Sequence, residues 1–441
     1  MQIFALIYAP LFLLVASRRP LWALISIFAL APLQFNVGGG GLSFSMAEVN
    51  LLLTSVVWVL RLRQSRYGLS LGPLTQPILS YLLVCALGAM VAWRGAGAVA
   101  SFVQMILYIV VTVLLFATLV PVEQLRLVYY SLIPVAVIWS FIGIGTKFFF
   151  MALGKNAFGG TLAPAFLVAL DLWLAKGYLR RPWNKDWERH LVFVAMMIIA
   201  AGLGMSLSRG AWIGTIGGIF MITMMRRASV RMAKMALLFL PLFVALWNSL
   251  PDRDQAYAFG FGTNRPNIRA RYRSIELAQT KFLDNPVLGS GVGLRKNYDA
   301  TNVVWSTLAE TGILGLLSFA WIYVVFYRLC WRSRRLLPSS DPRFSLLSLG
   351  CALMTCKILH GMVDQYWGRG SITLAWGAAG MTLAYCRIPL EVRAQRLVEA
   401  RRRHFSNSMM PHSLPSPLPS SQMPLPQTVA SAPFSSDGAR S

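Results

Sequence analysis

The stretch that decides the fold class is 303–327, which has the sequence VVWSTLAETGILGLLSFAWIYVVFY. A helix needs about 20 consecutive, mostly apolar residues to cross the hydrocarbon core of a membrane, and this run is long enough. Its one charged residue is Glu310. Similar runs recur along nearly the whole chain, which is 56% hydrophobic and 13% charged, whereas a soluble domain has about 25% charged residues. The sequence therefore predicts a polytopic membrane protein.

The apolar runs predict an all-α membrane helix bundle of about 12 or 13 spans with one large extracytoplasmic loop. The predicted spans are 2–16, 21–36, 43–60, 74–93, 99–120, 126–150, 159–176, 190–206, 211–225, 235–250, 303–327, 344–363 and 371–387. We expect a transmembrane bundle over 1–389 and a cytoplasmic tail over 390–441. The tail is first basic and then rich in Pro and Ser, a composition that predicts disorder.

The connections between the predicted spans alternate between strongly basic and weakly charged segments. The strongly basic ones are 18–19, 61–66, 176–189, 226–234 and 328–335. Basic loops stay on the cytoplasmic side of membrane proteins, so these connections are predicted to be cytoplasmic. With an odd number of spans, the amino terminus and the polar segment 251–302 then lie outside.

The polar segment 251–302 is unusually basic for an outer loop. Its basic residues are Arg253, Arg265, Arg269, Arg271, Arg273, Lys281, Arg295 and Lys296. Since basic residues are normally sparse on that side, an anionic substrate is the obvious reason for them. The net charge of +25 does not predict nucleic-acid binding, because basic loops orient membrane proteins and attract anionic lipid headgroups.

Two arginine-containing segments on the predicted outer side are candidates for binding that anion. Residues 206–214, SLSRGAWIG, place Arg209 at a membrane boundary, and residues 269–273 have the sequence RARYR. The plain interpretations are an arginine that extends its charge out of the membrane at a helix end and a solvated basic face. An anion site is the functional hypothesis for both segments.

Two further segments carry candidates for proton transfer. Glu310 lies a turn or two inside a predicted membrane helix, where a carboxylate is costly unless it is paired or functional. Residues 360–370, HGMVDQYWGRG, put His360 and Asp364 one helical turn apart on a shared face. A single His in such a place is more often structural, but a His–Asp pair beside Arg369 favours a catalytic interpretation.

Taken together and in this order, the patterns resemble the O-antigen ligase and Wzy-type polysaccharide polymerase family. The resemblance covers roughly 155–370. Residues 155–159, KNAFG, are similar to the family's KNxxG turn, and 208–210, SRG, to its signature after the middle helices. Residues 302–315, NVVWSTLAETGILG, are similar to its HNxxLxxLAExGxxG helix start. The outer-loop pattern is matched by Arg271, Ala278, Asn285, Pro286, Gly289, Gly291 and Gly293.

Two positions depart from the family pattern. Thr301 stands where the family usually has His, immediately before Asn302, and Ile275 replaces an aromatic residue that often follows the loop arginine. Because that His matters for activity in the ligase branch, its absence favours the polymerase branch.

The resemblance implies glycosyl transfer at the outer face of a bacterial inner membrane, in exopolysaccharide or O-antigen synthesis. The implied donor is an oligosaccharide on undecaprenyl pyrophosphate, and the implied partners are membrane lipid, a flippase and chain-length regulator proteins, with no nucleic acid. Pyrophosphate binding is expected from a set of cations: Lys155, Arg209, Arg271, Arg273 and Arg369. Guanidinium groups suit this role because they stay charged, pair bidentately with oxygens and can stabilise a leaving group that becomes negative.

The base that receives the proton of the acceptor hydroxyl is expected among His360, Glu310 and Asp299, in that order, with Asp364 as the partner of His360. Thr301 and Asn302 are expected to shape the acceptor groove or the loop. No carboxylate pair with metal-ligand spacing is evident in the sequence, so we expect a transfer that needs neither metal nor cofactor.

Other functional classes remain open on the sequence alone. A ligase would carry out the same chemistry on a different acceptor. A transporter could relay ions or substrate through the intramembrane carboxylates Glu48, Asp171 and Glu310. Against the transporter, the sequence has no internal repeat, and most polar residues gather on the predicted outer face. A non-catalytic assembly factor is the third alternative.

Overall fold

The computed structural model describes residues 2–33, 36–37, 44–61, 70–91, 96–145, 155–175, 186–231, 266–294, 300–339, 341–368 and 370–388, with isolated positions between 241 and 255. The contacts of the chain divide it into two units, Met1–Pro389 and Leu390–Ser441. The described residues all belong to the first unit. The predicted tail at 390–441 lies outside the described residues, as does nearly all of the predicted span at 235–250.

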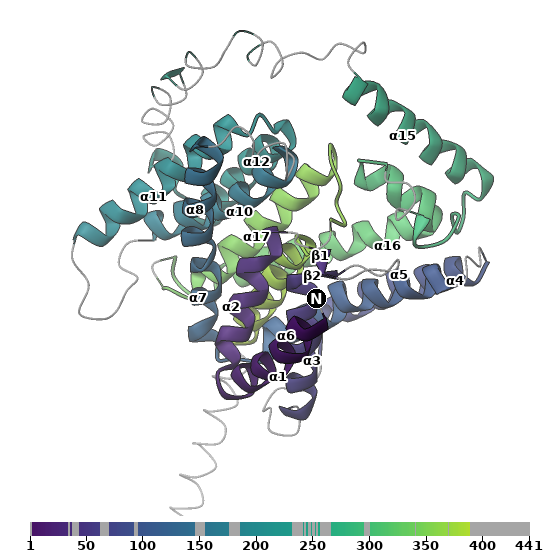
Figure 1. Ribbon diagram of the computed structural model, residues 1–441, viewed down its shortest axis with the longest axis horizontal. Helices are drawn as coiled ribbons and strands as arrows, with labels where there is room; N and C mark the ends of the chain where they lie inside the picture. Colours follow the sequence, from purple (N-terminus) through teal and green to yellow (C-terminus); the bar gives the residue numbers. More distant parts are fainter. Residues whose placement is uncertain are drawn as a thin grey trace, which may run out of the picture. The chain divides into compact units, whose positions relative to one another are not determined.

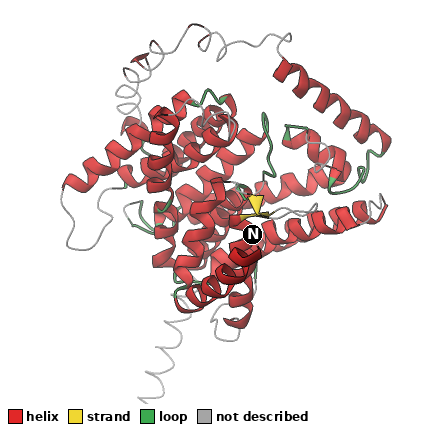
Figure 2. Ribbon diagram, in the orientation of Figure 1, coloured by secondary structure: helices red, strands yellow, loops and turns green. Residues whose placement is uncertain are grey.

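The described part of the chain is almost entirely helical (Figure 2). Within it, the strands are β1 (Asn36–Val37) and β2 (Phe44–Ser45), which pair antiparallel. The labelled helices (Figure 1) are α1 (Gln2–Arg18), α2 (Pro20–Leu30), α3 (Met46–Arg61), α4 (Thr75–Val91), α5 (Ala96–Ile106), α6 (Thr112–Thr118), α7 (Val122–Tyr130), α8 (Leu132–Gly145), α10 (Lys155–Leu174), α11 (Asp186–Met205), α12 (Arg209–Arg226), α15 (Pro266–Asp284), α16 (Val303–Ser333) and α17 (Phe344–Gly361). A further helix covers 372–388. The predicted all-α class is confirmed.

Seven helical segments of the described chain are long and apolar enough to cross a membrane. They are Gly72–Met90, Gly97–Thr118, Val122–Gly143, Asn156–Leu174, Trp187–Met205, Val303–Ser333 and Phe344–Gly361. The chain is therefore a multi-pass helical membrane protein, as the apolar runs predict. The larger expected number of spans and the side of the membrane on which 251–302 lies stay predictions. In the described part of that polar segment, the chain forms the helix α15.

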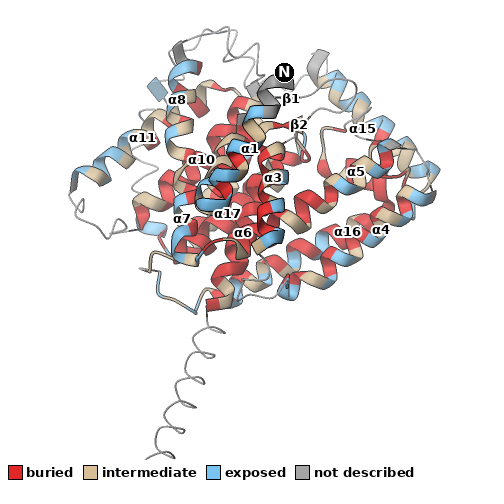
Figure 3. Ribbon diagram, turned by 60° about the horizontal axis from the view of Figure 1, so that its bottom comes forward, coloured by how far each residue is buried: buried red, intermediate tan, exposed pale blue. Residues whose placement is uncertain are grey.

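The centre of the bundle is formed by α10, α12 and α17, which pack against one another. Leu167 of α10, Ile222 of α12 and Leu353 of α17 are buried in the main apolar core. Toward the edge, α11 exposes Leu191 and Val194, and Figure 3 shows exposed residues along this helix and along α15. Exposed apolar side chains on such helices suit contact with lipid, because the hydrocarbon core accepts apolar groups.

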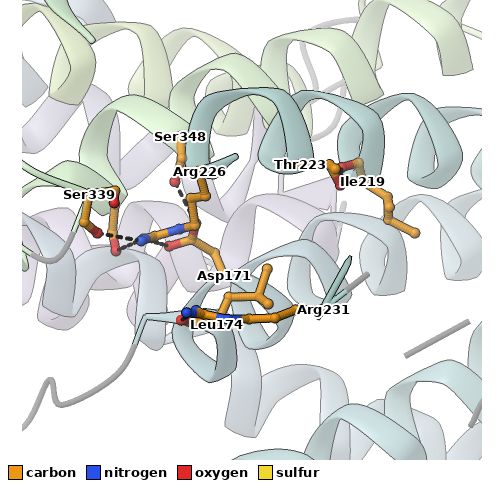
Figure 4. A network of polar contacts seen from close by, with 9 residues as sticks. Asp171, Leu174, Ile219, Thr223, Arg226, Arg231, Ser339 and Ser348 are labelled. Atoms are coloured by element: carbon orange, nitrogen blue, oxygen red, sulfur yellow. Dashed lines mark hydrogen bonds and ion pairs between the residues drawn. The ribbon is translucent and has the colours of Figure 1, made fainter. Parts of the chain in front are cut away.

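Helices α10 and α12 run side by side in the same direction. Polar contacts that join their amino ends and their carboxyl ends show this. Oγ of Ser208 lies 3.2 Å from Oδ1 of Asn156 at their amino ends. At their carboxyl ends, Arg226 forms an ion pair with Asp171 at 2.6 Å, with both side chains buried (Figure 4). The helical rise from Asn156 to Asp171 corresponds to about 23 Å. The two polar contacts are therefore separated by most of the thickness of a membrane.

The start of α3 explains how the buried carboxylate of Glu48 is satisfied. Ser45 and Glu48 form a reciprocal capping box: the backbone N–H of Ser45 donates to Oε2 of Glu48 at 2.5 Å, and the N–H of Glu48 donates to Oγ of Ser45 at 3.3 Å. The hydroxyl of Tyr108 also donates to Glu48. The carboxylate of Glu48 thus accepts a hydrogen bond from a backbone N–H group at the amino end of α3.

Helix α16 is interrupted at Gly312, whose φ of 64° and ψ of −166° are not helical. A Cβ at this position would lie 2.3 Å from the carbonyl oxygen of Val287, so the close approach requires glycine. The turn segment 285–294 packs into this interruption. Backbone hydrogen bonds join the two: Ser290 N to Ala309 O at 2.8 Å, Gly291 N to Glu310 O at 3.0 Å and Ile313 N to Pro286 O at 2.9 Å.

Candidate functional site

The His–Asp pair expected from the sequence lies at the carboxyl end of α17. Nε2 of His360 is 3.5 Å from Oδ2 of Asp364, and the two side chains are 12% and 18% exposed. This distance exceeds that of a good N–H···O hydrogen bond, so the contact is mainly electrostatic. The backbone N–H of Gln365 donates to Oδ1 of Asp364 at 2.8 Å and holds the carboxylate in place.

The imidazole of His360 fits between two helices because both present a glycine to it. A Cβ on Gly210 of α12 would lie 2.7 Å from Cδ2 of His360, and one on Gly160 of α10 would lie 2.9 Å from Cε1. Real Cβ atoms do not approach ring atoms so closely, so only glycine leaves room for the ring at either position. Gly160, the residue directly after the KNxxG-like pattern, and Gly210 of the SRG pattern are therefore both in contact with His360.

Asn156 and Ser208 connect those two patterns directly through their 3.2 Å contact. Behind it, a Cβ on Gly159 would lie 2.7 Å from Cβ of Ser208. Small residues on both helices thus allow the amino ends of α10 and α12 to approach closely beside His360.

Asn302 brings the third pattern to the same place. Its Oδ1 caps α16 by accepting from the backbone N–H groups of Val304 at 2.9 Å and Trp305 at 3.2 Å. Its Nδ2 donates to the carbonyl oxygen of Met362 at 2.8 Å, within the turn that joins His360 to Asp364. One amide side chain therefore both starts α16 and fixes this turn.

Thr301 lies beside this contact in a strained backbone conformation. Its φ of 47° is in the left-handed region, which β-branched residues adopt rarely. Its Oγ1 is 3.4 Å from Oγ of Ser274, so Thr301 touches α15. The predicted role of Thr301 in shaping a groove stays a prediction, but its neighbours are the loop helix and the His360 turn.

The electrostatics of Asp364 connect α15 to the pair. Burial has the largest single effect and raises the pKa of the Asp364 carboxyl. Its net pKa is nevertheless lowered, because the contact with His360, the charge of His360, the backbone N–H of Gln365 and the positive charge of Arg271 together outweigh burial. Arg271 is half-buried whereas Arg273 is exposed, as expected for residues two apart, which point to different sides of a helix. The structure therefore brings Arg271, and not Arg273, toward the pair.

A cavity of about 400 Å³ opens beside His360. Its polar lining comes from three separate parts of the chain: Asn156 and Thr161 of α10, Lys357 and His360 of α17, and Asp364, Gln365 and Ser371 beyond it. Pro164, Leu353 and Leu374 contribute apolar walls. Ligand pockets are usually concave, with apolar walls and convergent polar groups, and this cavity has both.

Lys357 is a cavity residue that the sequence analysis did not single out. It lies on α17 one turn before His360, and its Nζ donates to Oγ of Ser371 at 3.2 Å. The same Nζ is 5.7 Å from the centre of the Tyr366 ring. The signal for it was present, because a lysine inside a predicted membrane span marks a functional-site candidate.

Glu310 does not line this cavity. It is 3% exposed, and its Oε1 accepts a hydrogen bond from the backbone N–H of Gly293 at 3.0 Å. Its own backbone carbonyl holds Gly291. The carboxylate therefore anchors the turn segment 285–294 to α16, and its expected role as a candidate base stays a prediction.

Arg209 is the first residue of α12, next to Gly210. The N-cap residue, Ser208, makes no side-chain cap hydrogen bond. The positive end of the helix dipole repels an arginine at a helix amino end. The guanidinium and the positive end of the dipole together attract an anion, however. Arg209 thus lies one residue from the His360 contact, at a helix end suited to phosphate.

The remaining candidates are outside what the structure describes. Helix α10 begins at Lys155, whose side chain is outside the described part, and Arg369 and Asp299 are outside it entirely. Their predicted roles stay predictions.

No family model matches the chain, and no curated protein is significantly similar to it.

Proposed function

We propose that this protein is a membrane glycosyltransferase that polymerises undecaprenyl-pyrophosphate-linked repeat units on the outer side of a bacterial inner membrane. The observation that carries the proposal is the meeting of several patterns, distant in sequence, at His360. Gly160 and Gly210 enclose its ring, Asn302 fixes its turn, and Arg271 acts on its partner Asp364.

In the proposed reaction, the bond between the anomeric carbon of the donor sugar and the pyrophosphate oxygen breaks, and a bond to the acceptor hydroxyl oxygen forms. His360 accepts the proton of that hydroxyl. Asp364, kept ionised by its lowered pKa, orients the imidazole and stabilises the imidazolium that results. General base catalysis of this kind contributes about 10²–10⁴-fold in rate.

The leaving pyrophosphate gains negative charge as the bond breaks, so it needs fixed cations. Arg271 on α15, Arg209 at the amino end of α12 and Lys357 in the cavity are the described candidates. Arginine can bind phosphate oxygens bidentately, whereas lysine acts as a point charge. Lys357 is therefore the expected partner of a single oxygen deeper in the cavity.

The chemistry is the same for a ligase, which differs only in its acceptor. Thr301, where the ligase pattern has His, is the residue that favours polymerisation. The transporter alternative has less support, because each of the three intramembrane carboxylates has local structural partners. Glu48 caps α3, Asp171 pairs with Arg226, and Glu310 holds the turn segment.

An assay with lipid-linked repeat units in membrane vesicles tests the proposal. Elongation of the glycan on its carrier supports the polymerase, and transfer to a non-carrier acceptor supports the ligase. Translocation without bond formation would contradict both. A deletion strain gives the matching result in cells: single repeat units are expected after loss of a polymerase, and long chains left on the lipid carrier after loss of a ligase.

A further inference from the structure

A second cavity lies at the opposite end of the α10–α12 pair, far from His360. It has a volume of about 240 Å³ and is lined by Leu174, Arg226, Arg227, Ala228, Val230, Arg231 and Ser339. We call it the basic cavity, because three of these residues are arginines and none of the described lining residues is acidic.

Arg226 forms the fixed wall of the basic cavity. Its guanidinium donates to both oxygens of Asp171, at 2.6 and 2.8 Å. It also donates to the carbonyl oxygen of Ser339 at 3.0 Å and to Oγ of Ser345 at 2.9 Å. Figure 4 shows the guanidinium between Asp171 and Ser339. These contacts neutralise Arg226, so the surplus positive charge of the cavity comes from the other two arginines.

Arg227 and Arg231 supply that surplus charge at the mouth of the cavity. Both are exposed. Arg227 ends α12 with a φ of 51°, in the left-handed region. Nη1 of Arg231 lies 3.4 Å from the carbonyl oxygen of Leu174, and Figure 4 shows the two residues side by side. The mouth therefore presents two guanidinium groups that are four residues apart in the sequence.

An exposed apolar stripe on α12 leads to this mouth. Ile213, Ile216 and Phe220 are 45%, 67% and 60% exposed. Their spacing of three and four residues places them on one helix face, and α12 ends seven residues beyond Phe220, at the cap residue Arg227. The rise from Ile213 to Arg227 is about 21 Å, compared with about 15 Å for half of a hydrocarbon core. A lipid chain can therefore lie along the stripe while its headgroup reaches the arginines.

We propose that the basic cavity binds the headgroup of an anionic phospholipid, with an acyl chain along Ile213, Ile216 and Phe220. Charge complementarity selects an anion, and the exposed apolar stripe on the same helix selects a lipid over free phosphate. The expected cytoplasmic position of the basic connection 226–234 agrees with this, because anionic lipids attract basic cavities between membrane helices on that side. This inference does not depend on the proposed glycosyl transfer.

The test compares the purified wild-type protein with an Arg227→Gln/Arg231→Gln variant. Native mass spectrometry in detergent counts bound lipids during titration with phosphatidylglycerol, phosphatidylcholine or inorganic phosphate. The wild type is expected to bind phosphatidylglycerol selectively. In the variant, the dissociation constant for phosphatidylglycerol should rise about 30-fold, which corresponds to about 1 kcal/mol for each arginine.

The matched control is Arg328→Gln/Arg332→Gln, which removes two exposed arginines of α16 that do not line the cavity. This control should keep wild-type affinity. Equal loss in both variants, equal binding of phosphatidylcholine, or phosphate binding as tight as that of phosphatidylglycerol would each overturn the proposal. A dimer that forms only in the wild type and excludes lipid would also overturn it.

Discussion

Nδ2 of Asn302 donates a 2.8 Å hydrogen bond to the carbonyl oxygen of Met362, so the residue that begins α16 also holds the turn between His360 and Asp364. This contact joins the part of the chain that carries the loop arginines to the part that carries the candidate base. The proposed chemistry depends on such links, because a proton acceptor and an anion site must face the same reacting atoms.

The first prediction separates His360 from Thr301. His360→Ala should lower the polymerisation rate about 10²–10⁴-fold, because it removes a general base. Thr301→Ala should have a modest effect, because Thr301 is not the base. The measurement is chain length and rate with a lipid-linked donor at matched membrane levels. A severe Thr301→Ala defect beside a mild His360→Ala defect would reverse the assignment and favour a ligase.

The second prediction tests the space around the imidazole. Gly210→Ala should reduce activity strongly without altering any charge, because the new Cβ would meet Cδ2 of His360 at 2.7 Å and displace the ring. Gly97→Ala is the control, since a Cβ there meets nothing within 4 Å. Activity is measured as above, with membrane insertion checked by limited proteolysis. Full activity of Gly210→Ala would remove His360 from the site or show that its position is not critical.

The third prediction distinguishes two neighbouring arginines. Arg271→Lys keeps the charge but loses the bidentate fork, so chain formation should fall sharply while the protein still inserts. Arg273→Lys, on another side of the same helix, should stay near normal. Arg209→Lys should resemble Arg271→Lys. Near-normal polymers from both Arg209→Lys and Arg271→Lys would exclude these two residues from pyrophosphate binding.

The fourth prediction concerns Lys357. Lys357→Met removes the cavity cation and should raise the KM for the donor, whereas Lys357→Arg should retain part of the affinity. A purely structural lysine, bonded to Ser371, would instead lower protein stability in Lys357→Met with an unchanged KM. The experiment therefore measures both the KM and the thermal midpoint of each variant.

The fifth prediction concerns the buried pair of Asp171 and Arg226. Asp171→Asn should cost about 3–5 kcal/mol of stability, because a buried guanidinium loses its counter-charge. The activity of the protein that remains folded should be unchanged, since the pair lies at the other end of α10 from His360. Thermal unfolding and activity per folded molecule check this. A stable variant that has lost activity would indicate that Asp171 takes part in function.

The sequence predicts the contact between His360 and Asp364, because residues four apart stay close in a local turn. The helix itself ends at Gly361, however, so Asp364 lies in the turn after α17 and not on a shared helix face. Membrane helices follow from apolar runs, which are likewise local. The contacts of His360 with Gly160 and Gly210 are different, since they depend on how three helices pack. A glycine in an apolar run does not by itself show which ring it admits.

Glu310 shows a second kind of limit. A buried acid predicts a function or a structural partner, and the sequence does not place the structural partner found here, the backbone N–H of Gly293. Lys357 was a different case. Its position inside an apolar run already marked it, but its direction toward the cavity depends on the packing of α17.

The interruption of α16 at Gly312 has a consequence for how a long product could leave. The turn segment 285–294 replaces missing helical hydrogen bonds at membrane depth, and backbone groups exposed to lipid there would be costly. These hydrogen bonds hold the turn segment against α16. In the proposed polymerase, we therefore expect the growing sugar chain to move past this segment by one repeat unit after each bond is made.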